Sequence, residues 1–94
     1  MRSGQLPNRF ELEQNYPNPF NPTTQIRYSV FGQGLASLKV YDLLGREVAT
    51  IFEGIQRSGD HVATFDGAGL ASGVYLYRLN AGRFVETKKL VLLR

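Results

Sequence analysis

The sequence predicts an all-β fold, an antiparallel sandwich of about seven strands with immunoglobulin-like Greek-key connections. Three observations lead to this fold class. Apolar and polar residues alternate over several runs, turn-forming Gly, Asn and Asp recur at intervals of roughly 8–12 residues, and no segment shows a helical period. Because the Cys and Trp markers of antibody domains are absent, a small barrel is the alternative.

The 94 residues are enough for one domain and too few for two. We predict a flexible N-terminal linker or vector-derived remnant at residues 1–9 and a single sandwich at residues 10–94. The first residues lack the apolar stretch of a signal peptide. The longest apolar run, residues 90–93, is far too short to cross a bilayer, so no membrane insertion is expected.

A proline-rich segment follows a short strand that is expected at residues 10–14. Residues 15–22 hold three of the four prolines, and each proline removes a backbone donor and favours an extended residue before it. Neither a helix nor a central strand can continue through such a segment. We predict a rigid strap across one end of the domain, anchored by the apolar side chains of Tyr16 and Phe20.

The remaining strands follow from alternation between glycine-containing turns. They are expected at residues 24–30, 36–43, 48–52, 61–65, 74–79 and 83–93. In the first of these, the even-numbered residues from 24 to 30 are expected to face the core. The last strand ends in four apolar residues, 90–93, which are apolar on both faces and predict pairing in a sheet interior.

Composition excludes several kinds of chemistry. With no cysteine, the chain has no disulfide, no thiolate zinc site and no cysteine nucleophile. The net charge of +3 is spread along the chain, which indicates a solvated surface and no nucleic-acid partner. The glycine-containing segment 67–73 leads into a predicted strand, so it does not match a dinucleotide-binding loop, which opens a helix. We predict no metal and no cofactor.

One histidine, His61, follows Asp60 and Ser58 closely, which supplies the residue types of a hydrolytic triad. Adjacent residues of a strand point to opposite faces, so Asp60 and His61 cannot meet. The sequence therefore predicts a protein that is not an enzyme.

Four segments, in order, resemble the type A, immunoglobulin-like C-terminal sorting domains of type IX secretion, also called the Por secretion system. They are residues 12–22 (LEQNYPNPFNP), 40–48 (VYDLLGREV), 71–79 (ASGVYLYRL) and 88–94 (KKLVLLR). The residues that carry the structural part of the resemblance are Tyr16, Pro17, Asn18, Pro19, Phe20, Asn21, Pro22, Asp42, Gly45, Arg46, Gly73 and Tyr75. The chain departs from the family pattern at residues 31–34, where a Leu-Pro pair and an acidic turn are common, and at Phe65, where Trp is frequent.

This resemblance implies an address for secretion and cell-surface sorting. The implied partners are an outer-membrane translocon, shuttle proteins, a surface sortase and a cargo domain fused at the N-terminus. The implied route runs through the periplasm and outer membrane of Bacteroidetes-type bacteria to the cell surface or medium. We expect a monomer.

We place candidate recognition residues at the end of the sequence: Lys88, Lys89, Leu90, Val91, Leu92, Leu93 and Arg94. Their charges are available to a partner, and their apolar run is suited to adding a strand to a partner sheet. The alternative is that this strand simply completes the sandwich.

Two other functions remain open from the sequence. Secreted sandwiches often bind carbohydrate through exposed aromatic residues, so an adhesive or carbohydrate-binding module is one alternative. An immunoglobulin-like spacer or hook-assembly domain is the other.

Overall fold

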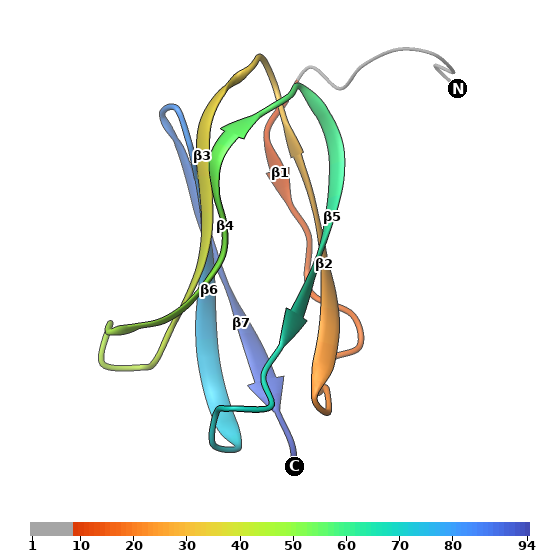
Figure 1. The fold of residues 1–94 in the computed structure, drawn as a ribbon, viewed down its shortest axis with the longest axis vertical. Helices are drawn as coiled ribbons and strands as arrows, with labels where there is room; N and C mark the ends of the chain where they lie inside the picture. The colour runs from red at the N-terminus through yellow and green to blue at the C-terminus, as the bar shows by residue number, and fades with distance from the viewer. Residues whose placement is uncertain (1–8) are drawn as a thin grey trace.

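Seven strands form two antiparallel sheets, with no helix among the described residues (Figure 1). The structure is a computed structural model that describes residues 9–94, so most of the predicted linker, residues 1–8, lies outside the described residues. The strands are β1 (Glu11–Leu12), β2 (Thr23–Val30), β3 (Gly34–Tyr41), β4 (Glu47–Gln56), β5 (Gly59–Asp66), β6 (Gly73–Ala81) and β7 (Phe84–Leu92). The predicted sandwich is confirmed, and the barrel alternative is wrong.

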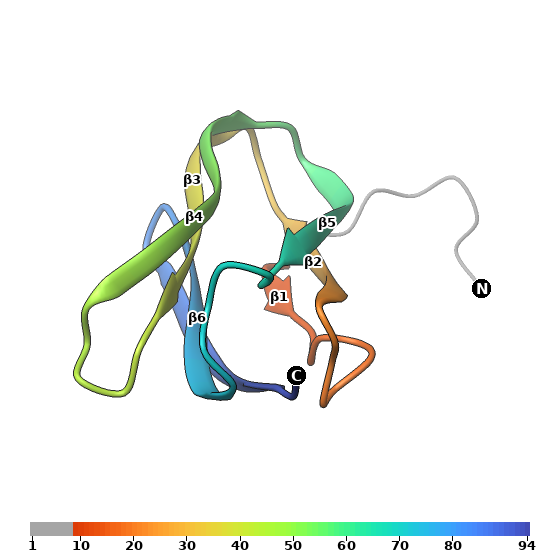
Figure 2. The same ribbon diagram turned by 60° about the horizontal axis from the view of Figure 1, so that its bottom comes forward.

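The strand order is that of an immunoglobulin-like Greek key. One sheet has the order β1-β2-β5 and the other the order β4-β3-β6-β7. The chain therefore changes sheet between β2 and β3, between β4 and β5, and between β5 and β6, as Figure 2 also shows. These crossings place strands that are distant in sequence side by side, which is why the core joins all parts of the chain.

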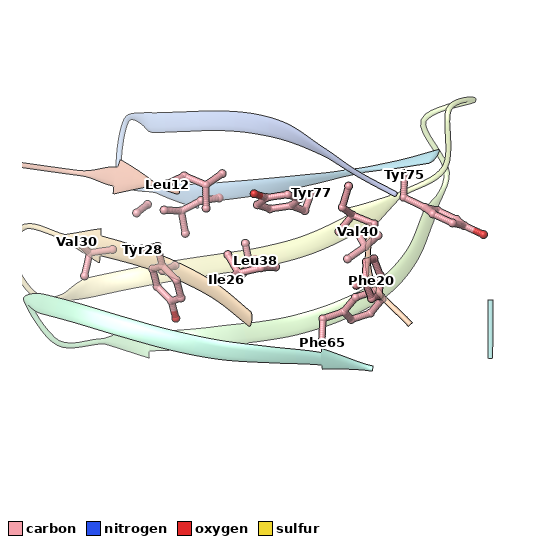
Figure 3. Packing of buried hydrophobic residues seen from close by; sticks show 14 of the residues in the cluster. Leu12, Phe20, Ile26, Tyr28, Val30, Leu38, Val40, Phe65, Tyr75 and Tyr77 are labelled. Carbon is pink, nitrogen blue, oxygen red and sulfur yellow. The ribbon is translucent and has the colours of Figure 1, made fainter. Parts of the chain in front are cut away.

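The core lies between the sheets and is filled by alternate residues of the strands (Figure 3). In β2 the predicted inward positions 24, 26, 28 and 30 are all buried. The buried apolar residues are Leu12, Phe20, Ile26, Tyr28, Val30, Ala36, Leu38, Val40, Phe65, Tyr75, Tyr77, Leu79, Ala81, Leu90 and Leu92. Phe65 occupies one of these positions, so the departure from Trp there is a change of core packing.

Strand β7 corrects one prediction. It lies at the edge of the four-stranded sheet and pairs with β6 alone, so it is not an interior strand. Leu90 and Leu92 face the core, whereas Val91 is half-buried and Leu93 is exposed. The run is apolar because its end is covered by the proline-rich strap, which forms a parallel bridge from Phe20 to Leu92.

The strap, defined as residues 15–22, is anchored by one of its two predicted residues. Phe20 is buried, and its ring centroid lies 6.0 Å from that of Phe65. The prediction for Tyr16 is wrong, because 80% of that residue is exposed. Tyr16 instead uses its backbone, exchanging two hydrogen bonds of 2.9 Å with Gln25, and its side chain is left pointing outward.

We predict that Phe20→Ala destabilises the domain by about 3–5 kcal/mol, because it opens a cavity where the strap meets the core. For a domain of this size the melting temperature falls by about 15–25 °C. Phe31→Ala is the matched control, since Phe31 is exposed and lies outside the core. Thermal unfolding of the two variants tests this, and an unchanged melting temperature for Phe20→Ala would contradict a structural role for the strap.

Candidate recognition site

Part of each of the four segments that carry the family resemblance lies at the same end of the sandwich. The register places Gly73 opposite Leu92 and Tyr41 opposite Leu76, and the strap reaches Leu92 through Phe20. We call this the motif end and define it as residues 16–22, 42–46, 67–73 and 90–94. In Figure 1 it is the lower end, and in Figure 2 it is turned toward the viewer. Segments that are far apart in sequence therefore make one surface.

The strap closes the outer edge of β7 at this end. The Asn18 side-chain oxygen accepts the Val91 N–H at 2.9 Å, and the Phe20 N–H donates to the Val91 oxygen at 3.0 Å. The Leu93 N–H then donates to the Phe20 oxygen at 3.0 Å. These backbone groups are already paired, so a partner strand cannot add at residues 91–93 unless the strap is displaced.

A buried polar cluster holds the base of the strap. The hydroxyl of the fully buried Tyr77 donates to the Glu13 carbonyl at 2.7 Å and accepts the Asn15 N–H at 2.8 Å. The Asn15 amide donates to Pro17 O and to Thr24 Oγ1, at 3.1 and 3.0 Å. This cluster fixes the strap to β2 and β6, and burial raises the pKa of Tyr77 to about 12.

Sequence reasoning did not identify this cluster. Tyr77 was expected in a β-rich strand, but alternation shows only that a side chain points inward, not which backbone groups its hydroxyl meets. The sequence feature that pointed to such a cluster was the hydroxyl of Tyr77 at an inward-facing position, because buried hydroxyl groups require hydrogen-bond partners. In residues 9–94, every buried side-chain nitrogen or oxygen has a hydrogen-bond partner.

The turn between β3 and β4 explains why Asp42, Gly45 and Arg46 occur together. Asp42 Oδ1 accepts the N–H groups of Leu44 and Arg46, both at 2.9 Å, and Oδ2 lies 2.7 Å from Arg46 Nε. The backbone N–H of Arg46, followed by its side chain, lowers the pKa of the Asp42 carboxyl. Gly45 has a φ of 86°, which favours glycine.

Gly67 lies in the packed interior of the motif end. A Cβ atom there would lie 3.2 Å from Leu92 and 3.3 Å from Phe20, closer than ordinary side-chain contacts. Its N–H donates to the Pro22 carbonyl at 2.8 Å. Nearby, the Tyr75 hydroxyl donates to Ala71 O at 2.6 Å. The loop before β6 is thus tied to the strap and to β7.

The charged residues among the seven candidates, Lys88, Lys89 and Arg94, do not form one cluster. Lys88 and Lys89 alternate across β7, and Lys88 Nζ lies 3.4 Å from a Glu86 carboxylate oxygen. The Arg94 guanidinium donates to the carbonyls of Ala68 and Leu70. Of the seven candidate residues, those with exposed side chains are Lys89, Leu93 and Arg94.

The residues of the hydrolytic-triad alternative have separate partners. His61 Nε2 lies 2.7 Å from the Arg57 carbonyl, and the His61 ring stacks on Tyr28 with 5.4 Å between centroids. Asp60 accepts a hydrogen bond of 2.6 Å from the Ser29 hydroxyl, and the Ser58 hydroxyl donates to a backbone carbonyl. His61 therefore fills an edge of the core, away from Asp60.

Residues 9–94 contain no group of three side chains suited to holding a metal ion. Within the same range, no helix is long and apolar enough to span a membrane.

Comparison with known families identifies the chain. The model of the secretion system C-terminal sorting domain matches residues 14–93. The chain belongs to this family. This match confirms the resemblance. The domain is therefore a C-terminal sorting signal for type IX secretion, with a cargo on its N-terminal side. Proteins that carry it are exported to the cell surface or the medium. No curated protein and no solved structure matches the chain significantly.

We predict that Tyr77→Phe costs about 1–3 kcal/mol, because it leaves the Glu13 carbonyl and the buried Asn15 N–H without their partner. The pH dependence should also change. The pKa is about 12 in the folded domain against 10.0 ordinarily, so the unfolded chain loses the proton first. This contribution to stability is complete below pH 10 and is lost between pH 10 and 12.

The free energy of unfolding of the native domain and of Tyr77→Phe is measured by denaturant unfolding at several pH values from 8 to 12. Tyr16→Phe is the matched control, because that side chain is exposed. If the native protein and Tyr77→Phe lost stability equally between pH 10 and 12, the buried hydroxyl would not be responsible.

Proposed function

We propose that this sorting domain is a non-catalytic targeting signal whose motif end is recognised by the type IX outer-membrane translocon, its shuttle proteins and a surface sortase. The route runs through the periplasm and across the outer membrane. One observation carries the proposal: each of the four segments typical of the family contributes part of its residues to the same end of the sandwich. A common surface of this kind allows one machinery to recognise unrelated cargoes.

The position of the cargo supports this assignment. The described chain starts at the opposite end from the motif end, where the Phe10 ring stacks on Phe84 with 5.3 Å between centroids. The long axis of the molecule measures 40 Å. The first described residue, on the side of the chain where the cargo is joined, is therefore far from the motif end (Figure 1).

Most family residues at this end are occupied in building it, which narrows the contact surface. Leu90 and Leu92 are in the core, and the backbone of Val91 is bonded to the strap. We assign direct recognition to Leu93 in the motif end and to Lys89, which directly precedes that end, because both side chains are exposed. Buried members act by holding these two in place.

The adhesive alternative is less well supported. Tyr75 and Tyr77, the aromatic pair of β6, are buried and offer no stacking platform for a sugar. The large exposed aromatic residues, Tyr16 and Phe31, lie at opposite ends of the molecule. These two side chains therefore do not combine into one stacking surface, and the family match favours sorting over a spacer role.

The test fuses the 94-residue chain to the C-terminal side of a periplasm-directed fluorescent reporter. It is expressed in a type IX-competent bacterium and in a secretion-deficient strain. We expect fluorescence at the surface or in the medium of the competent strain alone. A folded fusion that stays in the periplasm of both strains would overturn the proposal.

The assigned contact residues are tested in the same fusion. We predict that Lys89→Glu with Leu93→Ser lowers export about five- to tenfold, because both substitutions change exposed contact atoms and leave the core intact. Arg83→Glu with Val85→Ser is the matched control on the same hairpin, at the other end of the sandwich. Both double variants should keep the melting temperature of the native domain. Equal export of the two would remove these residues from the recognition surface.

A further inference from the structure

The turn between β3 and β4 carries two adjacent leucines that the fold leaves in solvent. Leu43 is 64% exposed and Leu44 is 79% exposed. Residues at such turns are usually Gly, Asn, Asp, Ser or Pro, since these satisfy the backbone locally or adopt its special conformations. In this turn Asp42 and Gly45 already meet those needs. The leucines are therefore not explained by turn formation or by packing.

The leucines are held in a fixed geometry. The Asp42 carboxylate bonds two backbone N–H groups of the turn and the Arg46 side chain, and the Asp42 N–H donates to the Arg46 carbonyl at 2.9 Å. The Gly45 N–H returns to the Asp42 carbonyl at 3.0 Å. A turn closed by these bonds loses little conformational entropy when it binds, which favours recognition by a partner.

The turn also projects from the body of the domain. In Figures 1 and 2 the loop that joins β3 and β4 extends beyond the neighbouring strands in both views. It belongs to the motif end and is continuous in the chain with the family segment 40–48. A protruding pair of branched apolar side chains fits a concave apolar pocket, whereas a flat surface would cover it incompletely.

We propose that Leu43 and Leu44 are a preformed apolar anchor that inserts into an apolar pocket of a protein of the secretion machinery. This inference rests on the proposed function and specifies how one part of the motif end is read. The paired Asp42 and Arg46 form the polar border of the anchor. Burial of the two leucines in the pocket supplies affinity, and the border fixes their orientation.

The surrounding charges favour a protein pocket over a lipid surface. Lys39 lies 3.4 Å from Glu47 and 3.5 Å from Glu53 on the neighbouring strand, and Asp42 neutralises Arg46. With Arg78, whose guanidinium lies 4.8 Å from the centre of the Tyr41 ring, these groups comprise three cations and three anions. Helices and loops that bind anionic membranes carry an excess of Lys and Arg around their apolar residues. The turn lacks that excess.

The same two strands provide a matched control. Leu35 and Ile55 are directly opposite each other in the β3–β4 register and are 72% and 60% exposed. They lie at the end away from the motif end, where Leu35 borders a groove of about 550 Å³ with Phe10 and Phe31. The pair is as apolar and as exposed as the proposed anchor, but it is outside the family segments.

The experiment compares three fusions of the whole chain to the periplasm-directed reporter: the native sequence, Leu43→Ser with Leu44→Ser, and Leu35→Ser with Ile55→Ser. Melting temperatures establish that each is folded. We expect the Leu43/Leu44 variant to lose about tenfold or more in export, and the Leu35/Ile55 variant to match the native fusion. Flotation with phosphatidylethanolamine–phosphatidylglycerol vesicles measures lipid binding by the native chain and by both variants.

The outcomes separate the anchor from the underlying function. Normal export of the Leu43/Leu44 variant would overturn the anchor and leave the sorting function intact. An equal loss in both variants would also overturn it, since the effect would then follow any exposed apolar pair. Vesicle binding that depends on Leu43 and Leu44 would replace the protein pocket with a membrane. A native fusion that is not exported would reject the proposed function and the anchor with it.

Discussion

The contact between the proline-rich strap and the outer edge of β7 is the interaction on which the motif end depends. An edge strand with free backbone groups is open to pairing with another chain. Here Phe20 exchanges hydrogen bonds with Val91 of β7 and with Leu93, directly after β7, while its ring enters the core. Because a strap with three prolines has few donors left on its other side, it ends the sheet and does not extend it. The same contact therefore completes the core and blocks edge pairing at this point.

The strap depends in turn on a buried hydroxyl. Tyr77 projects from β6 and joins the backbone at Glu13 and Asn15, which are more than sixty residues earlier in the chain. A single side chain thus fixes where the strap begins, and Phe20 fixes where it pairs with the outer edge of β7. Between these two points the segment has little freedom, although it has almost no regular secondary structure of its own. This is how an irregular segment becomes a defined part of a surface.

The residues of the motif end have two roles, because some hold the structure together and others face solvent. Its buried members hold four distant segments together, while a few side chains are left in solvent at positions that the fold does not require. Rigid presentation suits an address, since the partner meets a surface already in its bound shape and the domain contributes little entropy loss on binding. It also suits a signal shared by unrelated cargoes, because the surface is complete without any contribution from the cargo.

The sequence by itself determined the fold class, the approximate strands and the family. Alternation with a period of two is a local property, so it identified the inward face of β2 correctly. Strand order is not local, and the tertiary structure alone decided that β7 lies at an edge and that the strap covers it. The same holds for Tyr16, which was expected to be an anchor and points outward because its backbone pairs with Gln25. The run of candidate recognition residues was also divided by the fold, since neighbours on a strand face opposite sides and only some reach solvent.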